Sequence, residues 1–301
     1  MKNVLVFVIP IFIISCSGST KADKEVEKLK GPTAVNIYSN TMDIVMPDTL
    51  NAGLNHLVYK NNSDMTHFLL FNKVPEAVNL NKYHEELTRP FQELMDAINE
   101  NREPNATFPE WLGEMVNMGG VGLLSPGQTA VSYVHFEPGN YIVECYIKSN
   151  GIFHSTAGML KQITVISSNQ KQDRPESSVT IQVDSLGLSA DGKLPEREGN
   201  VNFKVTYGNS KLYSNFTRPD VHLAKITEST SSDILEVYMD WTNPRGMDAL
   251  APVVFLGGAQ EMPKSNTAYF SQYLSTGRYL LIGEVPNPKA HGFYIEFEIT
   301  D

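Results

Sequence analysis

The stretch GNYIVECYIKSNGIFHSTAGM, residues 139–159, is the part of this chain that decides its fold and its chemistry. It opens with alternating β-branched and aromatic side chains, which are typical of a β-strand, and Cys145 stands near the end of that run. A loop with two glycines follows and carries His154 and Met159, so that the spacing is C-x8-H-x4-M. The stretch therefore predicts a strand and a loop that together present a thiol, an imidazole and a thioether.

These side chains are ligands that suit copper. Thiolate and thioether are soft donors, and two histidines and a cysteine with a weak axial methionine form a blue-copper site. Such a site needs a second histidine, and the best candidate is His67, in a strand-like run at 65–70. The sequence therefore predicts one copper ion held by His67, Cys145, His154 and Met159.

Three further motifs accompany these ligands: THFLL at 66–70, LSPGQT at 124–129 and EPGNY at 137–141. With them, the region from about residue 32 to residue 165 resembles the type 1 copper proteins, the cupredoxins. The early histidine, the three late ligands in one loop and the Pro-Gly turn before the cysteine strand follow the order of that family. The C-x8-H-x4-M spacing is similar to the type 1 loop of copper nitrite reductases. The resemblance implies an all-β fold of Greek-key β-sandwiches and a type 1 copper ion that serves electron transfer.

The length and the net charge of the chain limit the number of domains and the kinds of partner that it can have. The chain has 301 residues, enough for about two domains of the usual size. Its 24 basic and 34 acidic side chains give a formal net charge of -10. An acidic surface argues against nucleic acid as a partner and would suit a basic redox protein.

The N-terminus has the features of an export signal. A short charged start precedes an apolar run at 4–14, which is shorter than the roughly 20 residues that span a bilayer. The following Ser15 and Cys16 resemble a bacterial lipobox. We therefore expect a signal peptide over 1–16 that ends at a lipidated Cys16, and a flexible tether over 17–32. An ordinary signal peptide with an incidental cysteine is the alternative. Lipidation implies a protein anchored in the bacterial cell envelope, at the outer membrane, facing the periplasm or the cell surface.

The chain contains only two cysteines. If Cys16 carries lipid, Cys145 has no disulfide partner, and metal ligation explains an unpaired thiol in an oxidising compartment. One alternative is that Cys145 packs as a small buried apolar residue. A nucleophilic pair of Cys145 with His154 is also conceivable, but the neighbouring Met159 argues against it.

The first β-sandwich is expected over 33–167, with a helical insertion at 73–118 between its strands. Apolar residues recur at helical spacing within this insertion, at Leu87, Phe91, Leu94, Met95 and Ile98. We expect the insertion to cover the sandwich; a role in shielding copper or docking a partner is the alternative.

A polar linker over 168–176 leads to a second β-sandwich over 177–301, interpreted as a degenerate cupredoxin-like domain without copper. Residues 277–283 align with 139–145 and place Gly283 where Cys145 stands. His222 falls in the strand that corresponds to the His67 strand, and His291 falls near the place of His154. An unrelated β-sandwich is the alternative for this half.

Catalytic copper centres need further ligands. In copper nitrite reductases and multicopper oxidases, histidines flank the type 1 cysteine, whereas Glu144 and Tyr146 flank Cys145 here. No His-x-His pair and no hydrolase or zinc-protease motif occurs in the sequence. These observations predict a protein that is not an enzyme.

The expected function is that of an exported electron carrier, which exchanges electrons with a redox protein partner by outer-sphere transfer. In cupredoxins the loop histidine lies at an apolar surface, and Ile152 and Phe153 are expected to supply that surface beside His154. One alternative is a copper-binding protein for storage or delivery without a redox partner. Another is a copper-free module for binding at the cell surface.

Overall fold

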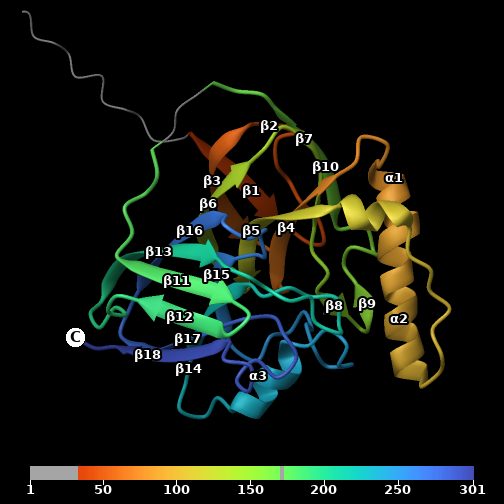
Figure 1. Ribbon diagram of the computed structural model, residues 1–301. Helices are drawn as coiled ribbons and strands as arrows, with labels where there is room; N and C mark the ends of the chain where they lie inside the picture. Colours follow the sequence, from red (N-terminus) through yellow and green to blue (C-terminus); the bar gives the residue numbers. More distant parts are fainter. Residues whose placement is uncertain (1–32, 170–172) are drawn as a thin grey trace, which may run out of the picture.

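Apolar side chains alternate along most strands, and this alternation builds two β-sheets with buried inner faces. In β3 (Gly53–Asn61), for example, Leu57 and Tyr59 are buried while the residues between them are less so. The computed structural model describes residues 33–169 and 173–301 (Figure 1). The predicted signal peptide, Cys16 and the tether lie outside the described residues.

The first half supplies strands on both sides of a helical segment. Its strands are β1 (Ala34–Ser39), β2 (Thr49–Asn51), β3 (Gly53–Asn61), β4 (His67–Val74), β5 (Val116–Leu124), β6 (Thr129–Phe136), β7 (Gly139–Glu144), β8 (Lys148–Ser149), β9 (Ile152–Phe153) and β10 (Leu160–Ile166). The helices between β4 and β5 are α1 (Leu80–Tyr83), the π-helix η1 (His84–Thr88), α2 (Arg89–Glu100) and the 3-10 helix η2 (Glu110–Glu114).

The second half follows the same plan with one short helix. Its strands are β11 (Val179–Asp184), β12 (Gly187–Asp191), β13 (Gly199–Tyr207), β14 (Val221–Ile226), β15 (Val254–Ala259), β16 (Thr267–Leu274), β17 (Gly277–Ile282) and β18 (Tyr294–Ile299). The helix α3 (Ser232–Tyr238) lies between β14 and β15. In the part of the chain that the structure describes, no helix combines the length and apolar character needed to cross a membrane.

Both sheets continue from one half of the chain into the other. The seven-stranded sheet has the order β1-β3-β6-β16-β13-β11-β12, and the nine-stranded sheet has the order β18-β17-β14-β15-β5-β4-β7-β10-β2. The two halves meet where β6 pairs with β16 and where β5 pairs with β15, with Leu124 opposite Leu256. Each half therefore covers sheet edges that the other half would otherwise expose.

The halves repeat one another strand by strand. In the first half, Leu70 of β4 lies opposite Gly120 of β5 on one side and Glu144 of β7 on the other. In the second half, His222 of β14 lies opposite Gly258 of β15 and Ile282 of β17. His222 thus occupies the position of Leu70, beyond the position of His67 at the start of β4.

A tyrosine repeats in the same way within β7 and within β17, and its hydroxyl bonds to a backbone carbonyl of the turn before the strand. The hydroxyl of Tyr141 donates to the carbonyl of Glu137 at 2.8 Å, and that of Tyr279 donates to the carbonyl of Ser275 at 2.7 Å. The expected all-β fold of two Greek-key, cupredoxin-like sandwiches is confirmed, and Gly283 follows β17 as Cys145 follows β7.

The helical segment packs along one side of the sheets, next to the β8–β9 hairpin (Figure 1). Tyr83, Leu87 and Trp111 of this segment form a small apolar cluster with Ile142 of β7. Gln92 of α2 ties the segment to the hairpin, because its amide donates to the carbonyl of Gly151 and accepts from the N–H of Phe153, each at 2.9 Å. The segment therefore covers the loop that carries the predicted ligands.

A single buried apolar cluster extends through both halves, from Leu57 and Phe136 in the first to Phe203 and Phe270 in the second. The division into two separately folding domains at the linker stays a prediction. At the seam between the halves, the backbones of β5 and β15 approach each other closely. A Cβ on Gly122 of β5 would lie 2.8 Å from the Cα of Gly258 in β15.

We expect Gly122→Ala to destabilise the protein by about 1–3 kcal/mol, because the added methyl group forces the two backbones apart. The measurement is chemical denaturation followed by circular dichroism. Gly113→Ala is the matched control, since a Cβ at Gly113 would meet no atom within 4 Å. Equal stability of the two variants would show that the seam between β5 and β15 tolerates separation.

Candidate metal centre

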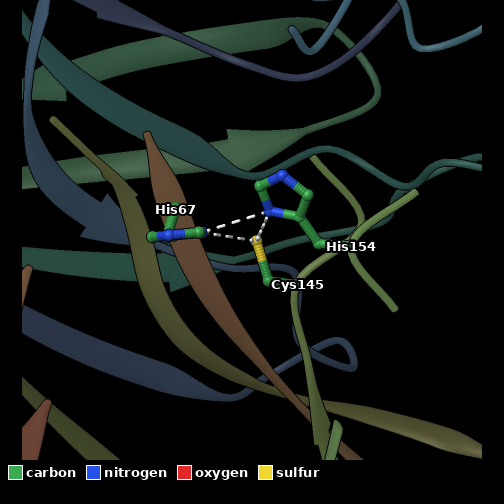
Figure 2. A group of neighbouring side chains, drawn as sticks. All are labelled: His67, Cys145 and His154. Atoms are coloured by element: carbon green, nitrogen blue, oxygen red, sulfur yellow. Dashed lines mark hydrogen bonds between the residues drawn. The ribbon is translucent and has the colours of Figure 1, made fainter. Parts of the chain in front are cut away.

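Three side chains that are distant in the sequence meet at one end of the nine-stranded sheet. His67 begins β4, Cys145 directly follows β7 and His154 directly follows β9. Strands β4 and β7 pair antiparallel, with Leu70 opposite Glu144. The beginning of β4 therefore lies beside the end of β7, and Figure 2 shows the three side chains pointing toward one another.

The donor atoms are close enough to share one ion. The Sγ atom of Cys145 lies 3.7 Å from Nδ1 of His67 and 3.9 Å from Nδ1 of His154, and the two Nδ1 atoms are 3.2 Å apart. For an ion with bond lengths like those of zinc, ligands in one plane would be about 3.5 Å apart between nitrogens and about 3.8 Å between nitrogen and sulfur. All three side chains are fully buried. The separations and the donor types therefore fit a metal ion held in a plane.

Burial keeps both imidazoles neutral. It lowers the pKa of His67 to about 3, with a further contribution from the neighbouring His154, and it lowers the pKa of His154 to about 4. A neutral imidazole has one unprotonated nitrogen that can bind a metal ion. The hydroxyl of Ser149 lies 2.8 Å from Nε2 of His154. This hydrogen bond orients the ring with its Nδ1 toward the centre, as second partners of metal-bound histidines do.

The cysteine needs a positive charge beside it to ionise. Burial raises the pKa of the Cys145 thiol to about 12, although hydrogen bonds from the backbones of Phe68 and Ile147 lower it in part. A thiolate is the form that binds metal. A bound cation would therefore displace the thiol proton and supply the charge that stabilises the thiolate.

Met159 lies in the same buried region. Its side chain is fully buried in the cluster that also contains Cys145, and its N–H donates to the carbonyl of His154 at 2.8 Å. The loop therefore holds its backbone against His154. The role of the Met159 thioether as an axial ligand stays a prediction, as does ligation by the other three residues.

The apolar surface expected beside His154 is smaller than predicted. Ile152 is 50% exposed, but Phe153 is only 3% exposed. Phe153 is buried because its ring packs edge-to-face on Trp241, with ring centroids 5.6 Å apart. The second half therefore covers a side chain that the sequence places at the surface.

Sequence reasoning also missed the role of Lys148, which looks like a surface lysine. The side chain is 1% exposed, and Nζ donates to the carbonyls of Trp241 and Asn243, each at 2.7 Å. Burial lowers its pKa to about 8. Lys148 directly precedes Ser149, which is the hydrogen-bond partner of His154. The buried lysine therefore holds the loop of Trp241 and Asn243 over Ser149.

A short backbone bridge strengthens that attachment. The N–H of Lys148 donates to the carbonyl of Met247 at 2.7 Å, and the N–H of Ala249 donates to the carbonyl of Lys148 at 2.8 Å. The carbonyl of Ala249 in turn accepts from Thr66 at 2.8 Å. The second half thus connects the residue before His67 to the loop that carries His154.

A second group of possible donors, Asp220, His222 and Glu284, is buried in the second half. Nδ1 of His222 accepts from the N–H of Leu123 at 3.0 Å. The proton of the neutral ring is therefore on Nε2, which lies 2.7 Å from Oδ2 of Asp220. His222 has no unprotonated nitrogen left for a metal ion, so we interpret the group as a structural pair. His291 is exposed and lies elsewhere, against the ring of Tyr213.

No protein-family model and no curated protein matches the chain. Among solved structures, it is similar to auracyanin A from Chloroflexus aurantiacus, described as a blue copper protein. That match has 18% identity and a TM-score of 0.27, and it covers 46% of this chain and 100% of the auracyanin. The similar structures thus include blue copper proteins, in agreement with the resemblance that the sequence shows, and at this TM-score the match carries no further conclusion.

Two similar structures are enzymes. A copper-containing nitrite reductase from Thermus scotoductus is 12% identical, with a TM-score of 0.22, and the match covers 89% of this chain and 61% of that one. A multicopper oxidase from Pediococcus acidilactici is 10% identical, with a TM-score of 0.23, over 90% and 59% of the two chains. The prediction that this protein is not an enzyme is corrected by these matches and is withdrawn. With TM-scores below 0.5, the matches assign no activity.

We expect Lys148→Met to destabilise the protein by about 2–4 kcal/mol, because it leaves two buried carbonyls without a donor. Lys193→Met is the control, since Lys193 is exposed and forms only a surface ion pair with Glu196. Thermal denaturation of both variants is the measurement. If Lys148→Met melts like Lys193→Met, the buried ammonium group does not hold the second half to the loop.

Proposed function

We propose that this protein binds one copper ion through His67, Cys145 and His154, with Met159 as a weak axial ligand, and that it transfers single electrons. The observation that carries the proposal is the buried group of two Nδ1 atoms and one Sγ atom, all within 3.9 Å of one another. Two imidazoles and a thiolate with a weak axial thioether form the donor set of blue-copper sites.

The donor set favours copper over zinc. Structural zinc sites close a tetrahedron with four strong ligands from cysteine, histidine or carboxylate. Among the described residues, the cluster around Cys145 contains no fourth ligand of that kind. A thioether, such as the buried Met159, is a soft ligand that suits copper.

When bound, copper would supply a one-electron couple. The chain contributes the rest of the mechanism by keeping the ligands in place. Ser149 orients His154, the backbones of Phe68 and Ile147 hydrogen-bond the sulfur of Cys145, and burial excludes water. Close-packed interiors resist rearrangement, so the ligand positions would change little when the charge of the site changes.

Burial argues for electron transfer over storage or delivery. Handing over an ion requires access to the ligands, and His67, Cys145 and His154 are each 0% exposed. Electrons can leave a buried centre without such access. We propose that a redox protein docks near the exposed Ile152, and the net charge of -10 would suit a basic partner.

We further propose that the protein is exported and anchored by lipid at Cys16. The apolar run at 4–14 and the Ser15-Cys16 junction support this proposal. In an exported protein, metal ligation would explain why the buried Cys145 is kept as a free thiol.

The protein with Cu(II) should take up one copper ion per chain and become intensely blue, because a thiolate ligand donates charge to copper. Cys145→Ser should abolish the colour. Met159→Leu should keep copper and colour but shift the reduction potential, since a weak axial ligand tunes the potential. Visible spectroscopy, copper analysis and voltammetry of the three proteins are the measurements.

A colourless, copper-free wild-type protein would refute the copper proposal and favour the copper-free binding module. Loss of all copper from Met159→Leu would show that Met159 is more than a weak axial ligand. Copper uptake without reversible redox behaviour would favour the storage protein.

Cys16→Ala should block lipid attachment, because the thiol of Cys16 is the proposed acceptor. Metabolic labelling with a fatty acid in a bacterial host measures the attachment. Cys145→Ala is the matched control and should label like the wild type. Equal labelling of the wild type and Cys16→Ala would contradict the lipoprotein proposal.

A further inference from the structure

A cavity of about 570 Å³ lies between the helical segment, the end of β7 and a loop of the second half. Cavities of roughly 300–1,000 Å³ are the usual size of small-molecule sites. Glu144 and Tyr146, on either side of Cys145, line it, and so do Phe153 and Ser155, on either side of His154. The cavity is thus a neighbour of the metal centre but contains none of its three donor residues.

Aromatic rings form one side of the cavity. Phe91 of α2 contacts Phe216 and Trp241 edge-to-face, with ring centroids 5.7 and 5.9 Å apart. Trp241 also contacts Phe153, and its indole N–H donates to the carbonyl of Asn215 at 2.6 Å. Ring faces of this kind attract organic cations, so this wall can bind both an apolar body and a positive charge.

Two carboxyl groups line the same cavity. Asn72 and Tyr83 both donate to Oε1 of Glu144, each at 2.6 Å, so that Oε2 is not used in these hydrogen bonds. Glu261 accepts from the side chain of Asn117 and from the N–H of Arg218.

The charges on the lining leave a negative excess. Among the described residues that line the cavity, Glu144 and Glu261 are acidic and the exposed Arg218 is the only basic one. Two carboxylates in a low-dielectric site repel one another, and a cation between them would stabilise both. The lining is therefore complementary to a positive ligand with an apolar body.

Phe216 at the rim supports a binding role. It is 46% exposed, and its backbone adopts a left-handed conformation with φ of 64°. This conformation is strained for a bulky residue, and such strain concentrates at ligand-binding and active sites. Its ring packs on Phe91 and Phe108, yet nearly half of the side chain remains exposed, where it can close an aromatic wall over a ligand.

We propose that this cavity is a binding site for a small organic ammonium ion with an aromatic or alkyl body, whose charge lies between Glu144 and Glu261 and whose body packs against Phe91, Phe216 and Trp241. The proposal goes beyond electron transfer and does not depend on it, because the cavity is formed by residues other than His67, Cys145 and His154. Binding is therefore expected with and without copper.

Isothermal titration calorimetry with phenethylammonium tests the proposal, using 2-phenylethanol as the neutral analogue and phenylacetate as the anionic one. One phenethylammonium ion should bind per chain, and the neutral and anionic analogues should bind at least about tenfold more weakly, because they lose a charge-assisted hydrogen bond. Equal binding of the cation and the neutral analogue, or no binding of the cation, would overturn the proposal.

Two substitutions test whether Glu144 and Glu261 bind the ammonium group of the ligand. Glu144→Gln keeps an oxygen that can accept from Asn72 and Tyr83, and Glu261→Gln keeps one for Asn117. Each should weaken binding about tenfold. Glu137→Gln is the control, since Glu137 is exposed on the turn before β7 and outside the cavity. Equal weakening by Glu137→Gln would mean that the cation responds only to the net charge of the protein.

Phe216→Gly separates binding from folding. Glycine accepts a positive φ without strain, so this variant should be at least as resistant to thermal denaturation as the wild type, and it should bind phenethylammonium several-fold more weakly. Unchanged binding by a folded Phe216→Gly would remove the aromatic wall from the site and contradict the proposal.

Discussion

The antiparallel pairing of β4 with β7 is the constraint on which the centre depends. With Leu70 opposite Glu144, the start of β4 lies beside the end of β7. This register places Nδ1 of His67 within 3.7 Å of the sulfur of Cys145, although the two residues are 78 positions apart. Because the side chains of a strand alternate between faces, a register shift of one residue would turn either ligand away. The hairpin after β7 then needs only a short loop to return His154 to the same point.

Within the described residues, the second half contributes no donor to this centre, yet it covers the loop that carries His154. Both sheets run through both halves, and the segment at 247–249 bridges Thr66 to Lys148. Trp241 covers Phe153, so the surface beside His154 narrows to Ile152. Gly283 stands where Cys145 stands in the first half, and the second half contacts the loop of the centre through Lys148 and Phe153. This arrangement is consistent with the low polarity that lowers the pKa of both imidazoles.

The centre and the cavity differ in how their polar groups are satisfied. At the centre, the three proposed ligands are fully buried, and Ser149 and the backbone form hydrogen bonds with His154 and Cys145. Nε2 of His67 has no hydrogen-bond partner among the described residues. At the cavity, the acidic side chains of Glu144 and Glu261 line the wall, and Phe216 is strained and half-exposed. A closed centre would suit an ion that is held permanently, whereas a strained rim and two acidic side chains would suit a ligand that enters and leaves.

The sequence by itself determined the features that depend on near neighbours in the chain. Local patterns in the sequence predict the strands and the turn glycines. They also show the spacing of Cys145, His154 and Met159 in one loop and the repeat of 139–145 at 277–283. Tertiary structure alone decided that Lys148 is buried, that His222 pairs with Asp220 and that Glu144 shares a cavity with Glu261. Burial of Lys148 and the shared cavity arise where the two halves pack together, and the protonation of His222 depends on the N–H of Leu123 from the other half. No local pattern in a sequence records contacts between residues about a hundred positions apart, so only the packing of the sheets could reveal them.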